Sequence, residues 1–251
     1  MVDEQKESAC VAIYDRLADG YGYDINATFS GQVKLELLRR YVRPEFRVLD
    51  VGCANGIHMR AVAPWCAHIT GIDINNRMLS LAVKKFQEEG LTNVDLKNES
   101  ATALPFANGS FDMAYSFSTL LLVHDVAAAI AEMSRVLRDG GIALFDIAGR
   151  HNLSRVYWGH YYRSRGHFGI NTFTREQSQR LLRDRGFEIL EEHAFGVLDQ
   201  WKCIPGVNRI NVLDRLVHGW FKQDLDYAVS NKKMFSSFAT RWYIAARKRC
   251  R

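Results

Sequence analysis

Short apolar runs alternate with amphipathic helical patterns along most of the chain, and this alternation restricts the fold more than any other feature. It is typical of parallel β-strands joined by crossover helices, so we expect an α/β protein. Seven strands are predicted, over residues 47–51, 69–74, 94–98, 111–117, 142–147, 187–192 and 239–246.

The helices predicted between these strands carry start and stop signals. Asp125 is a suitable N-cap for a helix over 126–138, which we expect Gly140-Gly141 to end. Thr174 and Gln177 can form a capping box for a helix that stops at Gly186.

The alternation is interrupted twice, after the fifth strand and between the last two strands. With 251 residues the chain is long enough for one large domain, 1–251. Within it we expect an N-terminal helical cap over 1–43, a lid over 148–173 and a substrate-side insertion over 196–236. Insertions at strand ends are where such folds build substrate pockets.

Composition excludes several classes of protein. No run of eighteen apolar residues is present, so no membrane span is expected, and the charged start lacks the apolar stretch of a secretory signal. The five cysteines are scattered and form no CxxC pair, which argues against a disulfide framework and a zinc site. We therefore expect a cytoplasmic protein without a metal.

The segment Val48-Leu49-Asp50-Val51-Gly52-Cys53-Ala54-Asn55-Gly56 reads as a buried strand, a tight glycine turn and the start of a helix. Asp73 follows Gly52 by twenty-one residues and ends the next strand. An acid at that position can accept both hydroxyls of an adenosine ribose.

A nicotinamide dehydrogenase uses the same strand, turn and acid, so it is the obvious competitor. Its fingerprint is GxGxxG, whose glycines admit a pyrophosphate. Here Gly52 and Gly56 lie four residues apart with Ala54 between them, and no GxGxxG occurs. The turn therefore suits a ligand without a pyrophosphate.

Taken in order, these features resemble the class I, Rossmann-like S-adenosylmethionine-dependent methyltransferases, especially the group that acts on small molecules. The resemblance runs from about Tyr14 to Glu192, and its further landmarks are Leu104-Pro105-Phe106, Ser110-Phe111-Asp112 and Arg135 to Gly141. It implies a doubly wound, mostly parallel seven-stranded sheet with an antiparallel last strand. It also implies S-adenosylmethionine as cofactor and S-adenosylhomocysteine as product.

The resemblance implies a set of cofactor-binding residues at the strand ends: Tyr14, Asp50, Gly52, Cys53, Ala54, Asn55, Gly56, Asp73, Ile74, Met78, Ser100, Ala101, Ser116 and Phe117. The glycine turn would hold the methionine part, with Asp50 orienting it and Tyr14 closing the site. Asp73 would hold the ribose, and Ile74 would pack on the adenine. One departure concerns the adenine amine, since the acid that commonly contacts it is replaced by Ser100.

The lid is rich in arginine, histidine and aromatic residues and contains no acid. One hypothesis is that it covers a small acceptor with an anionic group, bound by Arg163, Arg165, Tyr161 and Tyr21. The second is a solvated basic flap, and the third is a role at a membrane surface with a lipid-linked acceptor. His167 and His160 are the candidate general bases, although any single lid histidine is more often a packing or surface residue.

The second insertion has apolar residues at helical spacing, including Leu213, Leu216, Val217 and Trp220. This face either forms a pocket wall or makes a homodimer interface.

We therefore expect O- or N-methylation of a small metabolite or natural product by in-line transfer. The strand-four motif of amino-methylating nucleic-acid enzymes is missing, so no DNA partner is expected. An RNA methyltransferase has only the basic lid and tail in its favour, and a non-catalytic S-adenosylmethionine-binding protein is the remaining alternative.

Overall fold

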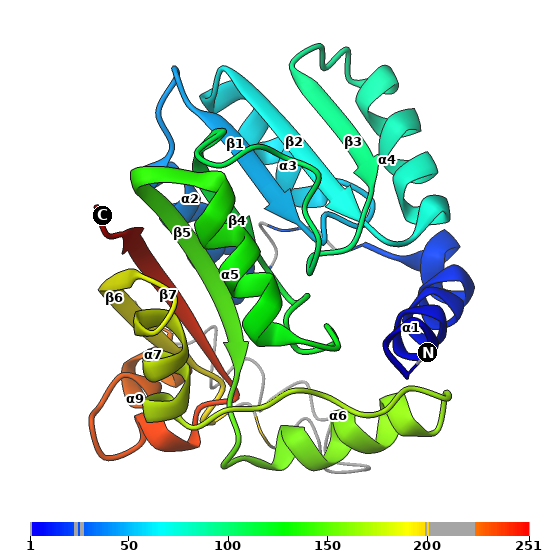
Figure 1. Ribbon diagram of the computed structural model, residues 1–251. Coiled ribbons are helices and arrows are strands. Elements are labelled where there is room, and N and C mark those ends of the chain that lie inside the picture. Colours follow the sequence, from blue (N-terminus) through cyan, green and yellow to red (C-terminus); the bar gives the residue numbers. More distant parts are fainter. Residues whose placement is uncertain (1, 23–24, 26–27, 199, 201–223, 251) are drawn as a thin grey trace.

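The computed structural model describes residues 2–22, 25, 28–198, 200 and 224–250. Its centre is a seven-stranded sheet in the order β3-β2-β1-β4-β5-β7-β6 (Figure 1). The strands are β1 (Arg47–Val51), β2 (His68–Asp73), β3 (Val94–Asn98), β4 (Phe111–Ser116), β5 (Leu137–Ala148), β6 (Phe187–Phe195) and β7 (Arg241–Lys248).

Strand direction follows the expectation. β1 pairs in parallel with β2 and β4, β2 with β3, and β4 with β5, whereas β7 runs antiparallel to both β5 and β6. The predicted doubly wound sheet with an antiparallel last strand is confirmed. The carboxyl ends of five parallel strands and the start of β7 consequently meet at one edge of the sheet.

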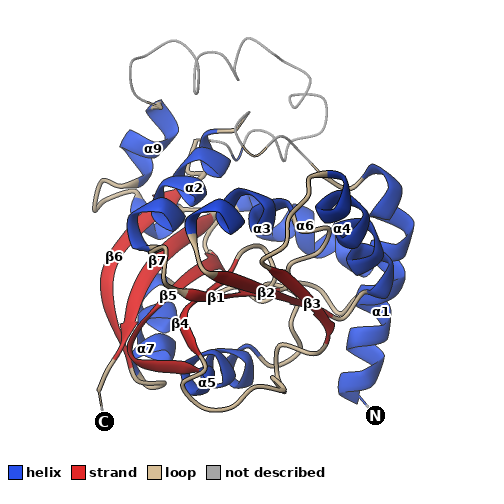
Figure 2. Ribbon diagram, turned by 90° about the horizontal axis from the view of Figure 1, so that it is seen from above, coloured by secondary structure: helices blue, strands red, loops and turns tan. Residues whose placement is uncertain are grey.

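Helices cover both faces of the sheet (Figure 2). One face is covered by α2 (Phe29–Tyr41), α3 (Ile57–Val62) and α4 (Asn76–Glu88), whose apolar residues share a buried cluster with Val48, Ile69 and Tyr115. The other face is covered by α5 (Val126–Val136) and α7 (Arg175–Arg183), which pack on Leu49, Phe145 and Trp242. Burial of these two apolar layers is the main stabilising contribution to the fold.

Local capping signals also take their expected form. The side chain of Asp125 accepts a hydrogen bond from the backbone of Ala128 at the start of α5. Thr174 and Gln177 form the complete capping box of α7. These contacts satisfy backbone N–H groups that a helix start leaves without partners.

The predicted end of the helix over 126–138 is wrong. α5 ends at Val136, and β5 already begins at Leu137, which pairs with Phe111 of β4 and is fully buried. The pairing of β4 with β5 then shifts register before Ile142, and Gly140 in that interval has a φ of +74°. The two glycines therefore form a bulge in the strand rather than a helix cap.

Two helices outside the sheet layers lie at its carboxyl edge (Figure 1). They are α1 (Val2–Leu17) and α6 (Leu153–Arg163), which follows β5 within the segment 148–173. Ile13 of α1, Leu121 and Leu122 of the loop after β4, and Tyr162 of α6 form a third buried cluster. This cluster fixes the helices over the strand ends.

Within the second insertion only α9 (Leu225–Ser230) and its flanks are described. The apolar helical face predicted for this insertion lies outside the described residues; it comprises Leu213, Leu216, Val217 and Trp220.

Candidate functional site

A cavity opens at the carboxyl edge of the sheet. It lies between α1, the ends of β1 and β2, and the loops after β3 and β4. It is lined by Glu7, Cys10, Val11, Tyr14, Tyr21, Gly52, Ala54, Ile72, Asp73, Ile74, Asn75, Met78, Glu99, Ser100, Ala101, Phe117, Ser118, Thr119, Leu122, Val123 and His124.

The glycine turn forms one wall of the cavity in a left-handed backbone conformation. Its φ angles are +82° at Gly52, +46° at Ala54 and +74° at Gly56. A Cβ on Gly52 would lie 2.1 Å from Thr119 Oγ1, so the turn is packed directly against the loop after β4. Only glycine combines that φ with that approach.

Asp73 links the turn to the end of β2. Its Oδ2 accepts a hydrogen bond from the backbone N–H of Ala54 at 2.8 Å, and its Oδ1 accepts one from Asn75 at 2.9 Å. Burial raises the pKa of this carboxyl, and these backbone N–H groups oppose the rise. Each oxygen keeps a lone pair, so the carboxylate can still accept two hydroxyl groups from a ligand in the cavity.

Ala54 is a non-glycine residue with positive φ, which costs free energy unless the surroundings hold it. Here the hydrogen bond from its N–H to Asp73 does so. Ala54 of the turn and Asp73, nineteen residues apart in sequence, thus belong to one structural unit.

Apolar side chains and a carboxylate form the far end of the cavity. Ile74, Met78 and Ala101 give it apolar walls. Ser100 lies there too, and its hydroxyl donates to Glu7 Oε1 of α1 at 2.6 Å. Glu7 thus brings an acid into contact with Ser100, which replaces the expected acid at this edge and has Glu99 as its neighbour in sequence.

Five of the predicted cofactor residues support the cavity rather than line it. Asp50, Cys53, Asn55 and Ser116 are buried behind it, and Gly56 starts α3. The Asn55 amide donates to the backbone carbonyl of Tyr21 at 2.7 Å, and the Ser116 hydroxyl donates to that of Val51 at 3.0 Å. Burial raises the pKa of Asp50 to about 8. The other nine line the cavity, and their role in binding stays a prediction.

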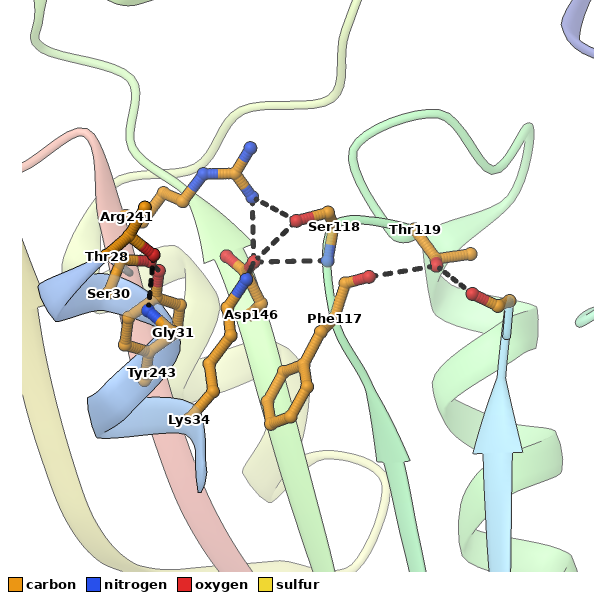
Figure 3. Close-up of polar contacts among 11 residues, drawn as sticks. Thr28, Ser30, Gly31, Lys34, Phe117, Ser118, Thr119, Asp146, Arg241 and Tyr243 are labelled. Atoms are coloured by element: carbon orange, nitrogen blue, oxygen red, sulfur yellow. Dashed lines mark hydrogen bonds and ion pairs between the residues drawn. The ribbon is translucent and has the colours of Figure 1, made fainter. Parts of the chain in front are cut away.

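A buried ionic cluster adjoins the cavity beside Ser118 (Figure 3). Asp146 of β5 is fully buried, and its Oδ2 lies 2.8 Å from Arg241 Nη1 and 3.6 Å from Lys34 Nζ. The backbone N–H and the hydroxyl of Ser118 donate to the same oxygen at 3.1 and 3.2 Å. Burial favours a raised pKa for Asp146, but Arg241 and Lys34 hold it below its usual value.

The residues predicted to bind the acceptor divide into two groups. Tyr21 lines the cavity, and its ring packs edge-on against Tyr14. Arg163 and His160 lie instead along a separate depression on α6, and Arg165 stacks on Tyr161 at 3.6 Å. These four residues do not line the cavity.

His167 has a packing environment. It is buried, its ring packs on Tyr162, and its Nδ1 lies 2.6 Å from the carbonyl of Gly169. Burial lowers its pKa, so the ring is neutral near pH 7. His58 is likewise buried, with a pKa lowered to about 3 by burial and by Lys34.

Several residues of the site escaped sequence reasoning. Glu7, Ser118 and Thr119 contact other cavity residues, and Lys34, Asp146 and Arg241 form the ionic cluster. None belongs to a local motif. The only available signal was the position of Asp146 near the end of a predicted strand, where such folds place functional groups.

The described residues contain neither a candidate membrane-spanning helix nor a candidate metal-binding cluster. No helix among them has the length and apolar character needed to cross a membrane. Within the same part of the chain, no three His, Cys, Asp or Glu side chains gather as they would around a metal ion.

Residues 49–145 match the family model described as a methyltransferase domain. An uncharacterized protein of Methanocaldococcus jannaschii is 31% identical over 145 residues, 58% of this chain and 53% of that protein. The O-methyltransferase rstn1 of Aspergillus nomiae is 36% identical over 40% of this chain and 46% of its own. The chain thus spans about half the length of the curated relatives it matches.

Among solved structures, the [4+2]-cyclase SpnF superposes with a TM-score of 0.63 at 24% identity, covering 88% of this chain and 82% of that one. This likeness shows the fold. The matched family model, on this Rossmann-like fold, identifies residues 49–145 as part of a class I, S-adenosylmethionine-dependent methyltransferase domain.

Proposed function

We propose that this protein transfers the methyl group of S-adenosylmethionine to an oxygen or nitrogen atom of a small-molecule acceptor. The observation that carries the proposal is the joining of Asp73 to the glycine turn, inside a cavity with an apolar far end. The carboxylate of Asp73 fits the diol of an adenosine ribose, and the glycine turn fits an amino-acid moiety. The turn has no glycine pattern that would hold a pyrophosphate.

The cavity residues divide the cofactor between them. Asp73 accepts the ribose hydroxyls, Ile74 and Met78 enclose the adenine, and Gly52 with Ala54 holds the methionine part. Phe117, Ser118 and Thr119 then border the reacting end, since they follow β4 and line the cavity, and Thr119 packs on Gly52. Bound S-adenosylmethionine supplies an activated methyl group, so the protein has chiefly to align the acceptor and exclude water.

The lid histidines contribute little to this arrangement. His160 is exposed on α6, and His167 is held by Gly169, so neither faces the methyl donor's place beside Ser118. We therefore assign no general base to the lid. The acceptor would instead lose its proton through its own acidity when it is bound. An acceptor that binds as an anion needs no base.

A binding protein without methyl transfer is the second candidate. The fold is shared with the [4+2]-cyclase SpnF. A non-methylating protein would bind the cofactor and leave it intact with every acceptor.

The test is calorimetry of the full chain with S-adenosylhomocysteine and with NAD, followed by S-adenosylhomocysteine release from S-adenosylmethionine over an acceptor library. The proposal expects micromolar binding of the first ligand only, and turnover with at least one small molecule. NAD binding, or binding without any turnover, contradicts it.

Glu7 is proposed to replace the missing acid at the adenine amine. Its carboxylate, positioned by Ser100 and with His124 Nδ1 at 3.4 Å, lines the cavity at the adenine end. Wild type should prefer S-adenosylhomocysteine over S-inosylhomocysteine, whose ring carries a carbonyl in place of the amine. In Glu7→Gln that preference should shrink at least about tenfold, because a hydrogen bond to a charged group is worth about 1.5–3 kcal/mol.

Glu99→Gln is the matched control, since Glu99 lines the same end of the cavity. Competition calorimetry measures both affinities. An unchanged preference in Glu7→Gln, or its loss in Glu99→Gln instead, contradicts the assignment.

A further inference from the structure

The ionic cluster beside the cavity carries an unbalanced charge. Among the described residues its ionic members are the cations Lys34 and Arg241 and the single carboxylate Asp146. The side chains of Lys34 and Asp146 are 5% and 0% exposed, so little solvent screens them. A net positive charge in such surroundings is costly, and a bound anion would reduce that cost.

The guanidinium of Arg241 has an edge available for that anion. Within the part of the chain that the structure describes, its hydrogen bonds use Nη1, to Asp146 Oδ2 at 2.8 Å and to Ser118 Oγ at 3.3 Å. Nε and Nη2 have no hydrogen-bond partner among the described residues, and Figure 3 shows the second terminal nitrogen directed away from Asp146. These two nitrogens present parallel N–H groups, the geometry that binds a carboxylate through both oxygens.

Asp146 holds this edge in place. Contact through one guanidinium nitrogen fixes the arginine without consuming its fork, and Lys34 compensates the carboxylate from the opposite side through α2. Lys34 itself lies over the rings of Phe117 and Tyr243, at 5.4 and 5.3 Å, and so is enclosed. The side chain of Arg241 is 29% exposed, so of the two cations in the cluster it is the one that a ligand can reach.

The position of Arg241 relates this edge to methyl transfer. Ser118, its hydrogen-bond neighbour, lines the cavity next to Gly52 and Thr119. On the lid side, the positive charge of Arg241 acts on the Tyr162 hydroxyl, which lies 3.3 Å from the hydroxyl of Tyr14, another cavity residue. Arg241 therefore stands one side chain away from the cavity, on the side opposite the adenine end.

We propose that Arg241, oriented by Asp146 and Ser118, is the anchor of a carboxylate on the acceptor, and that the methyl-accepting atom of the same molecule lies toward Ser118. This inference rests on the proposed function. It assigns the acceptor to the small carboxylic acids and moves the anion site from the lid arginines Arg163 and Arg165 to the start of β7.

The test uses the full chain saturated with S-adenosylhomocysteine and saturation-transfer NMR. The probes are benzoate, 4-hydroxybenzoate, cinnamate, indole-3-acetate and malonate, each paired with its neutral primary amide. At least one carboxylate should bind while its amide does not. Arg241→Lys keeps the charge opposite Asp146 and removes the fork, so it should fold and raise that probe's Kd at least tenfold.

Arg138→Lys is the matched control, because Arg138 pairs with Asp112 at the far edge of the sheet. It should bind the probe as wild type does. The proposal is overturned if no carboxylate is preferred to its amide, or if the preference survives in Arg241→Lys. Calorimetry of S-adenosylhomocysteine on the same samples tests the proposed function separately from the carboxylate site. If S-adenosylhomocysteine does not bind, the proposed function is contradicted. The comparison of carboxylate and amide probes on the ligand-free protein then still tests the site at Arg241.

Discussion

Asp73→Ala is expected to weaken S-adenosylhomocysteine binding by about 10²–10⁴-fold while the protein stays folded. Two hydrogen bonds from the ribose to a carboxylate contribute about 1.5–3 kcal/mol each, and a factor of ten corresponds to about 1.4 kcal/mol. The substitution also removes the acceptor for the N–H of Ala54, whose positive φ then lacks its support. The glycine turn should lose order together with the ribose contact.

Asp95→Ala is the matched control for this experiment. Asp95 lies on the adjacent strand β3, pairs with His68 and is 67% exposed, so its removal should leave the affinity unchanged. Calorimetry on both variants gives the Kd values, and circular dichroism verifies the fold. An Asp73→Ala protein that binds within about threefold of wild type would show that the carboxylate is not the ribose ligand.

The part of the cavity proposed to hold the cofactor could be located from the sequence because its signals are local. A strand, a glycine turn and an acid at the next strand end follow each other within thirty residues, and the fold brings them together in every such sheet. The register shift at Gly140 was missed because glycine ends helices and forms bulges through the same freedom of φ. Pairing of Leu137 with Phe111, far away in sequence, decided between the two.

The proposed acceptor site could not be predicted in the same way. Lys34, Asp146 and Arg241 are separated by about a hundred residues each and carry no shared motif, so only the folded sheet shows that they meet. Glu7 has no distinguishing motif in the sequence, and only the position of α1 at the strand ends brings it to Ser100. Arg163 and Arg165 were predicted to bind the acceptor because basic residues cluster in the lid sequence. That clustering does not place them at the cavity.

Asp146→Asn is expected to lower the free energy of unfolding by about 3–5 kcal/mol, the cost of leaving buried charges without their partner. Asparagine keeps the shape of the side chain and removes the negative charge that Arg241 and Lys34 share. Chemical denaturation followed by tryptophan fluorescence measures the change through the shifted midpoint. Asp112→Asn is the control, because that half-exposed pair with Arg138 should cost no more than about 1 kcal/mol.

A second substitution separates charge from shape. Burial lowers the pKa of Lys34, and Asp146 opposes that effect, so without Asp146 the amine should lose its proton at still lower pH. A base whose folded pKa lies below its unfolded value makes stability rise with pH, because the unfolded chain then holds more protons. The deficit of Asp146→Asn should therefore shrink between neutral and alkaline pH, and Lys34→Met added to it should restore at least about 1 kcal/mol at pH 7. A deficit that neither alkaline pH nor Lys34→Met reduces would mean that packing, and not the paired charges, makes Asp146 necessary to the fold.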